Sequence, residues 1–166
     1  MALDLTLDGE LRPWEPIPGV GEDFCIDPVL AGFNTSDLIN QYTTPLDCSS
    51  GYIIQPKTLV LGWTAEKLKL PHTARVAARV EGKSSLARIG LGIHVTAPTI
   101  HAGFGHNELQ PDSEGSPIRL EIWNIGPLKI KLTKGMPICQ LIFEEVHGTP
   151  QKGYAGMFAG QGPTQP

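Results

Sequence analysis

Hydrophobic and polar residues alternate with a period of two along several short stretches between residues 52 and 143. Such alternation is typical of β-strands that bury one face. The stretch 118–125 is the clearest case, because Arg119, Glu121 and Trp123 would share one face and the aliphatic residues between them the other. The pattern predicts strands at residues 52–55, 58–64, 75–80, 92–97, 118–125, 128–132 and 138–143.

A helical pattern is convincing only at residues 84–91, where Ser84 or Ser85 is the expected N-terminal cap. The chain has 166 residues, of which 19 are glycine and 15 are proline, a composition that favours turns over long helices. Many short strands and one short helix predict a single all-β domain, built as a β-roll, a jelly-roll-like barrel or a sandwich. A helix bundle or a parallel α/β sheet would need more helical periodicity.

The two ends of the chain differ from its middle. Residues 1–50 are rich in proline, glycine and aspartate and show little periodicity, so we expect them to pack on a β core formed by residues 51–147. A role in a subunit contact and a disordered lead of about 10–20 residues are alternatives for this segment. Residues 148–166 are rich in glycine, proline and glutamine and are expected to form a mobile tail.

Charge and hydropathy narrow the class of partner. The apolar runs fall short of the ~20 residues of a membrane span, and no basic-then-apolar leader opens the sequence, so a cytoplasmic location is expected. The net charge is −4, but residues 75–166 carry nine cations against seven acids, whereas residues 1–47 carry nine acids and one cation. An anionic ligand is therefore expected in the second half. Without a lysine and arginine run, binding to nucleic acid is not expected.

The cysteines and histidines do not predict a metal site. Cys25, Cys48 and Cys139 form no C-x-x-C pair and are expected to be buried reduced thiols. His94 and His101 come nearest to a metal pair but lack a supporting ligand, so no metal held by protein side chains is expected. The P-C-x-x-C string of zinc-dependent nucleobase deaminases is absent, as are the P-loop, the Rossmann fingerprint and the serine-hydrolase elbow.

A phosphate-binding arrangement is suggested by residues 81–88. Lys83 supplies an ammonium group, Ser84 and Ser85 supply hydroxyls, and the start of the predicted helix supplies free N–H groups. A capped surface helix with a solvated lysine is the alternative. Arg88 lies four residues after Ser84 on the same helical face. It could contact a triphosphate, orient a carboxylate or be an exposed arginine.

Glu121 is the candidate for proton transfer. A carboxylate within an apolar strand is either buried, which raises its pKa and suits it to acid–base work, or exposed in an ion pair. Its neighbour on the same face is Arg119, so a surface ion pair between the two is the alternative. His94, taken alone, is most simply explained as a structural histidine.

Four segments together resemble the dCTP deaminase family, a branch of the trimeric dUTPase-like superfamily. The similarity extends over residues 52–166 and is weak before residue 50. The segments are Glu-Gly-Lys-Ser-Ser-Leu-Ala-Arg-Ile-Gly-Leu (81–91), His-Val-Thr-Ala (94–97), Leu-Glu-Ile-Trp-Asn (120–124) and Lys-Gly-Met-Pro-Ile-Cys-Gln-Leu-Ile-Phe (134–143).

The resemblance implies a homotrimer of β-rolls with active sites between subunits. It also implies hydrolysis of dCTP to dUTP and ammonia without catalytic zinc, with Mg²⁺ bound through the substrate triphosphate. Glu121 and Arg88 match the catalytic glutamate and its neighbouring arginine. The remaining matches are Lys83, Ser84 and Ser85 for phosphate, His94, Val95 and Ala97 for the pyrimidine and the attacking water, and Tyr154 and Gln161 for closure over the nucleotide.

The chain departs from the family at several positions. His101 stands where the family has an aspartate that contacts the sugar and, in dUTPases, positions the water that attacks phosphorus. Residues 105–117 form an insertion, and Met157 replaces a common phosphate-binding lysine. We count His101 and Arg119 among the candidate substrate-binding residues. Two alternative functions are a bifunctional enzyme that produces dUMP, which the missing aspartate disfavours, and a non-catalytic nucleotide-binding trimer.

Overall fold

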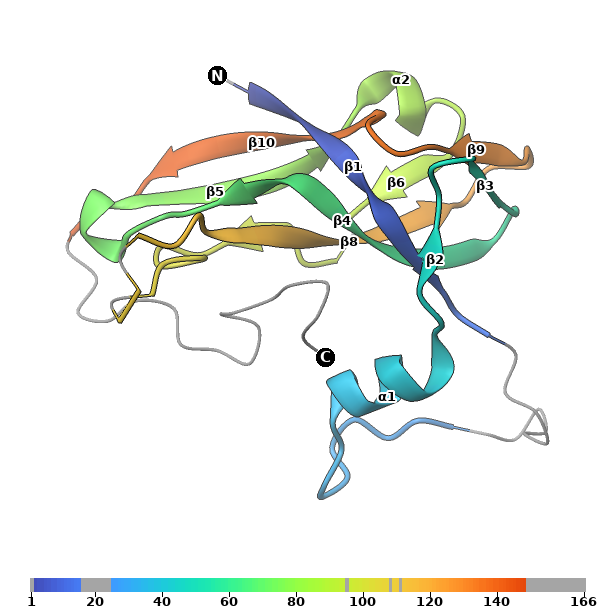
Figure 1. The fold of residues 1–166 in the computed structure, drawn as a ribbon, viewed down its shortest axis with the longest axis horizontal. Coiled ribbons are helices and arrows are strands. Elements are labelled where there is room, and N and C mark those ends of the chain that lie inside the picture. Colours follow the sequence, from blue (N-terminus) through green and yellow to red (C-terminus); the bar gives the residue numbers. More distant parts are fainter. Residues whose placement is uncertain (1, 16–24, 95, 108, 111, 149–166) are drawn as a thin grey trace.

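The fold is built around one long curved antiparallel sheet (Figure 1). The computed structural model describes residues 2–15, 25–94, 96–107, 109–110 and 112–148. The sheet has eight strands in the order β6–β8–β4–β1–β10–β5–β7, with β2 paired to β1, and β3 and β9 form a separate two-stranded sheet. The strands are β1 (Ala2–Pro13), β2 (Leu46–Asp47), β3 (Tyr52–Ile54), β4 (Thr58–Leu68), β5 (Val76–Gly82), β6 (Leu91–Ile93), β7 (Thr99–Ile100), β8 (Ser116–Asn124), β9 (Ile130–Leu132) and β10 (Pro137–Glu145). The predicted all-β fold is confirmed.

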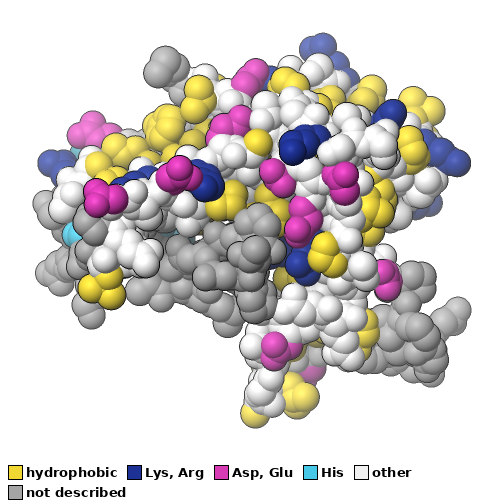
Figure 2. Space-filling model, viewed as in Figure 1, with side chains coloured by type: hydrophobic (Ala, Val, Ile, Leu, Met, Phe, Trp, Pro, Cys, Tyr) yellow, Lys and Arg dark blue, Asp and Glu magenta, His cyan; other side chains and the backbone are white. Residues whose placement is uncertain are grey.

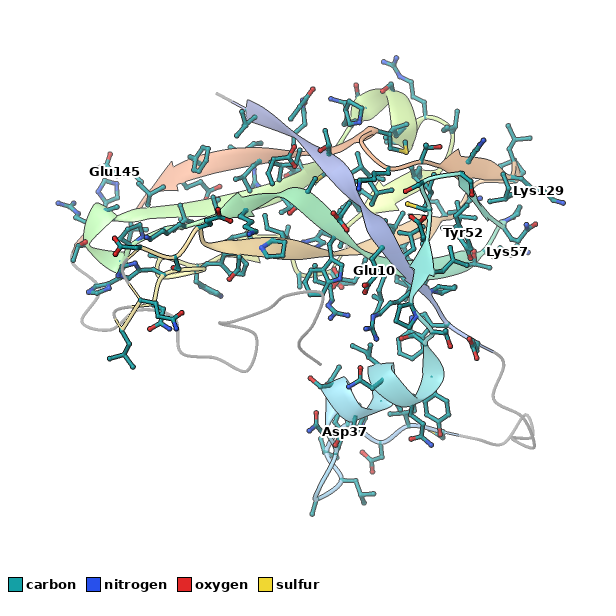
Figure 3. All side chains as sticks on the ribbon, in the orientation of Figure 1. Glu10, Asp37, Tyr52, Lys57, Lys129 and Glu145 are labelled. Atoms are coloured by element: carbon teal, nitrogen blue, oxygen red, sulfur yellow. The ribbon has the colours of Figure 1, made fainter. Side chains whose placement is uncertain are left out.

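Alternation along the inner strands produces the core. In β8 the even-numbered residues from Ile118 to Asn124 are buried, and Arg119, Glu121 and Trp123 are partly exposed on the other face, as the sequence predicted. Leu120 and Ile122 belong to one hydrophobic core cluster, which also contains Leu11, Val60 and Leu141 from other strands of the sheet. Figure 3 shows the length of the sheet, with Lys57 and Lys129 at one end and Glu145 at the other.

The N-terminal strand is the main difference from the sequence prediction. β1 lies between β4 and β10 inside the sheet, and Leu5, Leu7 and Leu11 are buried in the core. Residues 2–13 therefore form part of the β core that we expected to begin at residue 51. The polar residues between these leucines face outward, which is why the composition of the segment concealed a strand.

Helices are short and occupy opposite sides of the sheet in Figure 1. The predicted helix at 84–91 is present only as α2 (Ser84–Ala87), and its N-cap is Lys83 rather than a serine, because the Lys83 carbonyl accepts the first helical hydrogen bonds. The sequence analysis missed α1 (Thr35–Tyr42), whose N-cap Asn34 accepts hydrogen bonds from the amides of Ser36 and Asp37. A 3₁₀ turn, η1 (His72–Ala74), precedes β5.

The segment from α2 to β6 is fixed against the end of β8. Gly90, with φ of +90°, lies so close to Gly126 that an added Cβ would be 2.3 Å from the Gly126 nitrogen. Asn124, which is fully buried, donates to the carbonyls of Ile54 and Leu128 and accepts from the Gly126 amide. These contacts determine where the candidate phosphate-binding segment lies.

The cysteines and the strand predicted at 92–97 agree with the sequence analysis only in part. Cys48 and Cys139 are buried free thiols, as predicted, whereas Cys25 is a free thiol that is exposed. The predicted strand at 92–97 ends at Ile93, because His94 adopts a left-handed conformation with φ of +49° that does not continue a strand. None of the helices in the described ranges is long and apolar enough to cross a membrane.

Candidate functional site

A cavity of about 650 Å³ lies beside the outward face of β4 and β8. Its walls come from this face, from the residues around α1 and from the segment between β6 and β8. A volume of this size suits a nucleotide-sized ligand. Its lining residues are Trp14, Ile26, Thr35, Leu38, Ile39, Leu59, Leu61, His94, Ala97, Thr99, Ile100, His101, Phe104, Ile118, Arg119 and Glu121.

Glu121 contributes a carboxylate to this cavity, and its partner is His94. Oε2 of Glu121 lies 3.2 Å from Nε2 of His94, and the Glu121 side chain remains 35% exposed. Nε2 also forms a short hydrogen bond with the carbonyl oxygen of Arg119. Because a carbonyl oxygen only accepts, Nε2 carries a hydrogen and can also orient the carboxylate. The alternative of an ion pair between Glu121 and Arg119 is not found among the described residues.

Arg119 is held by an aromatic ring instead. Its Cζ atom lies 4.1 Å from the centroid of the Trp63 ring, and Trp63 is almost completely buried. Burial lowers the pKa of Arg119, the nearby Arg12 guanidinium lowers it further, and Glu121 and Glu10 oppose these effects. Nη1 of Arg119 is buried and has no hydrogen-bond partner within the described residues.

The structure brings five of the predicted site residues to one cavity: His94, Ala97, His101, Arg119 and Glu121. Arg119 and Glu121 come from β8, and the three others come from the segment between β6 and β8, on either side of β7. Three other predicted residues, Val95, Tyr154 and Gln161, lie outside the described residues.

The predicted phosphate-binding residues do not line this cavity. Ser84, Ser85 and Arg88 are exposed on and after α2, and none of them has a side-chain partner in the described part of the chain. Nζ of Lys83 lies 2.7 Å from Oδ1 of Asp4 on β1. Hydrogen bonds from Lys83 and then from Gln140 hold the pKa of Asp4 below its ordinary value of 3.8. In one copy of the chain, the two halves of the predicted site are therefore separate.

Several cavity residues were not predicted from the sequence. Leu59 and Leu61 line the cavity from one face of β4, and their period-two spacing in a predicted strand was a usable signal. Trp14 and the α1 residues reach the cavity through tertiary packing, which gives no local sequence signal. Asn34 before Asp37 was a signal for α1 itself.

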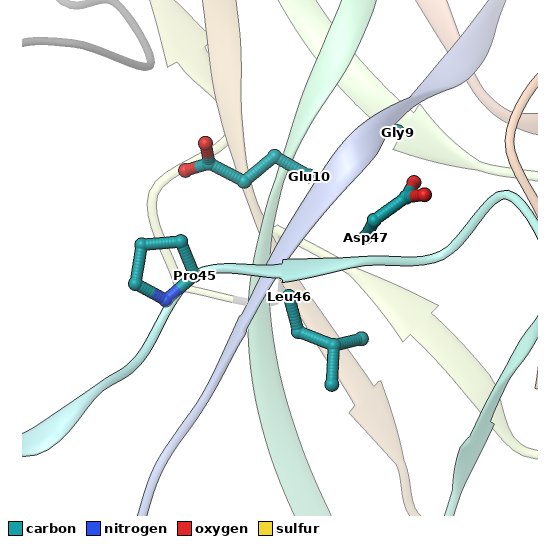
Figure 4. Close-up of a pocket in the computed structure, with 5 residues that line it drawn as sticks. All are labelled: Gly9, Glu10, Pro45, Leu46 and Asp47. Carbon is teal, nitrogen blue, oxygen red and sulfur yellow. The ribbon is translucent and has the colours of Figure 1, made fainter.

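A second hollow, of about 250 Å³, lies where β2 crosses β1 (Figure 4). Glu10 and Asp47 line it, with Gly9, Pro45 and Leu46. Both acids have partners already, since Glu10 pairs with Arg12 and Asp47 accepts from Ser49. A hollow lined by two carboxylates disfavours a polyphosphate.

The surface shown in Figure 2 has no broad basic area, because acidic and basic side chains are interspersed on it. Within the described ranges, no group of three or more histidine, cysteine, aspartate or glutamate side chains could hold a metal ion.

Comparison with known proteins gives a consistent result. Residues 2–146 match the sequence model of the family described as dCTP deaminase-like. A protein of Persephonella marina named "dCTP deaminase, dUMP-forming" is 37% identical over 145 residues, covering 86% of this chain and 73% of the relative. A "dCTP deaminase" of Rhodospirillum rubrum is 37% identical over 155 residues, covering 93% of this chain and 72% of the relative.

A solved structure gives an independent comparison of the fold. The 2′-deoxycytidine 5′-triphosphate deaminase from Agrobacterium tumefaciens superposes with a TM-score of 0.60 at 22% sequence identity. The match covers 88% of this chain and 39% of that chain. At this identity the likeness concerns the fold.

Proposed function

The chain belongs to the dCTP deaminase-like family, and we therefore propose that it hydrolyses dCTP to dUTP and ammonia, with Glu121 transferring the protons. The observation that carries this proposal is the position of the Glu121 carboxylate, beside His94 at a cavity that can hold a pyrimidine nucleotide. Zinc has no part in the proposed mechanism.

The chemistry follows from one carboxylate and one water. Glu121 takes a proton from the water as its oxygen attacks C4 of the cytosine ring, and it passes that proton to N3. The tetrahedral intermediate then loses its C4–N4 bond as the second proton moves from the new hydroxyl through Glu121 to the leaving nitrogen, which departs as ammonia. Acid–base transfer of this kind contributes about 10²–10⁴-fold. Burial of the ring in the cavity would strengthen the fixed hydrogen bonds around it.

Phosphate binding is proposed for Lys83, Ser84 and Ser85, with Arg88 beside the reacting ring. Mg²⁺ would enter bound to the triphosphate, as part of the substrate. This segment and the cavity lie apart in one copy of the chain. We therefore propose that a neighbouring copy supplies the 83–88 segment to each cavity, in a homotrimer with sites between subunits. Val95, Ala97 and His101 would contact the pyrimidine and sugar, and Tyr154 and Gln161 would close over the nucleotide.

Complementation between inactive variants tests the shared site. Glu121→Gln and Arg88→Ala are each expected to be inactive as pure trimers. If each site combines Glu121 of one copy with Arg88 of the next, about one quarter of the sites in an equal mixture, unfolded and refolded together, contain both native residues. Recovery of that fraction of wild-type activity supports a shared site. No recovery, in a mixture shown to form mixed trimers, argues for a site within one chain.

A second candidate function is deamination followed by diphosphate release, giving dUMP. The name of the Persephonella marina relative, "dCTP deaminase, dUMP-forming", favours it. His101 counts against it, because the cavity wall carries an imidazole where the family resemblance expects the aspartate that positions water for attack on phosphorus.

Product analysis separates the candidates. Purified protein is incubated with dCTP, CTP or dUTP and Mg²⁺, and ammonia and diphosphate are measured. Ammonia without diphosphate from dCTP supports the proposed deaminase. Ammonia with diphosphate supports the dUMP-forming enzyme. Tight nucleotide binding with neither product would identify a non-catalytic nucleotide-binding protein.

A further inference from the structure

Buried polar atoms without a hydrogen-bond partner indicate how a ligand would be oriented in the cavity. In the described residues, buried side-chain atoms without a hydrogen-bond partner include Nη1 of Arg119 and Nδ1 of His94, and both residues line the cavity. Leaving the charged donor Nη1 of Arg119 buried and unpaired is costly, so this position is expected to be completed by a bound group with an acceptor atom.

The Arg119 guanidinium is fixed in place before a ligand arrives. It stacks on Trp63 at 4.1 Å, and its main-chain carbonyl accepts a hydrogen bond from the ring of His94. Stacking restricts the plane of the guanidinium and therefore the direction of its N–H groups. Arg12 lies on β1, which β4 separates from β8 in the sheet, and it is already engaged by Glu10 and Asn40. It therefore adds positive potential near Arg119 without satisfying Nη1.

Arg119 and Glu121 are two residues apart on the same face of β8. That separation is roughly 6.6 Å along a strand, comparable with the width of a pyrimidine ring and its exocyclic groups. A guanidinium only donates hydrogen bonds, so it can pair with the O2 carbonyl of cytosine, which is an acceptor. It cannot pair with the cytosine amino group, which is a donor. The ring would therefore lie with O2 toward Arg119 and the amino group toward Glu121.

We propose that Arg119 is a specificity-determining residue that donates a hydrogen bond from Nη1 to the O2 carbonyl of the pyrimidine and so directs C4 toward Glu121. The inference rests on the proposed function and extends it. A phosphate oxygen is a poorer occupant, because most of the residues around the cavity are apolar and Glu121 is an acid. Lys83 and its neighbours supply a separate group of phosphate donors.

The test combines substitutions of Arg119 with a change of the O2 atom of the nucleotide. Arg119→Met keeps an unbranched side chain that can cover Trp63 and removes the hydrogen-bond donors. Arg119→Lys keeps the positive charge but lacks the planar guanidinium with its paired N–H groups. Each variant is tested with dCTP and with 2-thio-dCTP, in which sulfur, a weaker acceptor, replaces O2. Arg79→Met is the control, because Arg79 is a half-exposed arginine on β5 that pairs with Glu81. Thermal unfolding checks that all variants fold.

The wild type and Arg79→Met are expected to prefer dCTP over 2-thio-dCTP by roughly 10–100-fold in kcat/KM, the size of a hydrogen bond to a charged donor. Arg119→Met should reduce this preference to within about threefold, with Arg119→Lys between. If Arg119→Met folds and keeps the full preference, the inference is wrong while the deaminase proposal stands.

Binding titrations with the same two nucleotides separate the remaining outcomes. If the wild type releases no ammonia but its binding preference disappears in Arg119→Met, the assignment of Arg119 stands and the deaminase proposal fails. If the wild type binds neither nucleotide, both fail.

Discussion

His94 contacts Glu121 through both its side chain and its backbone. Nε2 of His94 lies 3.2 Å from the carboxylate oxygen Oε2, and the amide of His94 donates to the Glu121 carbonyl at 3.2 Å. The left-handed conformation of His94 turns the chain away from β8 immediately after these contacts. The position of the proposed proton carrier is therefore coupled to a turn in the segment that also lines the cavity.

Replacing Glu121 by glutamine should separate binding from chemistry. The amide keeps the size of the side chain and contacts with a ligand, but it cannot accept and return protons. We expect dCTP affinity within about threefold of wild type and a loss in kcat of roughly 10³-fold or more. Isothermal titration and a single-turnover ammonia assay measure the two quantities. A rate near that of the wild type would remove Glu121 from its proposed role.

His94→Asn should impair catalysis by misplacing the carboxylate. Asparagine tolerates a positive φ better than most residues other than glycine, so the turn is retained. Its shorter side chain does not reach Glu121 as the imidazole does. We expect kcat to fall by about 10²-fold with a smaller change in KM, as expected from a displaced reacting group. His147→Asn, at an exposed position, is the control. Equal kcat in both variants would contradict a positioning role.

Lys83→Ala should weaken binding in proportion to the phosphates on the ligand. The loss of an ammonium should reduce dCTP affinity by about 10–100-fold and leave deoxycytidine affinity unchanged. Lys67→Ala is a matched control, because Lys67 on β4 is also paired with a carboxylate, that of Glu114, and is outside the 83–88 segment. Equal weakening of both ligands in Lys83→Ala would contradict phosphate recognition by Lys83.

The sequence predicted the strands whose alternation between a buried and an exposed face is visible over a short stretch of residues. The alternation at 118–125 identified the two faces of β8 because Leu120 and Ile122 are in the core while Glu121 faces the cavity. The same alternation in Leu3, Leu5 and Leu7 marks β1, but its short length and the acidic, proline-rich surroundings concealed it. β1 pairs with β10, more than 130 residues away in the sequence, and local composition does not reveal such pairing.

The candidate site was predictable only in part for a related reason. The roles proposed for Glu121 and Lys83 come from residue types and family resemblance, and the structure adds the cavity at Glu121. The contact between His94 and Glu121 depends on how β6 pairs with β8, and the stacking of Arg119 on Trp63 depends on the register of β4 against β8. Contacts across strands follow from register, which long-range packing determines.

Asn124→Ala should destabilise the fold more than a typical polar substitution. The side chain is fully buried and joins β3, the turn after β8 and Gly126 through three hydrogen bonds. Its removal takes one hydrogen-bond partner from the buried carbonyl of Ile54 and from the partly buried carbonyl of Leu128 and amide of Gly126, so the free energy of unfolding should fall by about 2–4 kcal/mol. Urea denaturation measures the change. Asn107→Ala, at an exposed loop position, should lose about 1 kcal/mol or less, and an equal loss in both would contradict the prediction.

Thiol labelling should distinguish the three cysteines by burial. Burial raises the pKa of Cys139 to about 12, and burial followed by the nearby Asp47 carboxylate raises the pKa of Cys48. Because the thiolate is the reactive form, a raised pKa leaves both residues as unreactive thiols in mildly alkaline buffer, and their burial also excludes the reagent. Cys25 is exposed, so the native protein should show one rapidly reacting thiol with 5,5′-dithiobis(2-nitrobenzoate), and the unfolded protein should show all three. Cys25→Ser should abolish the rapid reaction; a rapid equivalent that persists in this variant would mean that Cys48 or Cys139 is open to solvent.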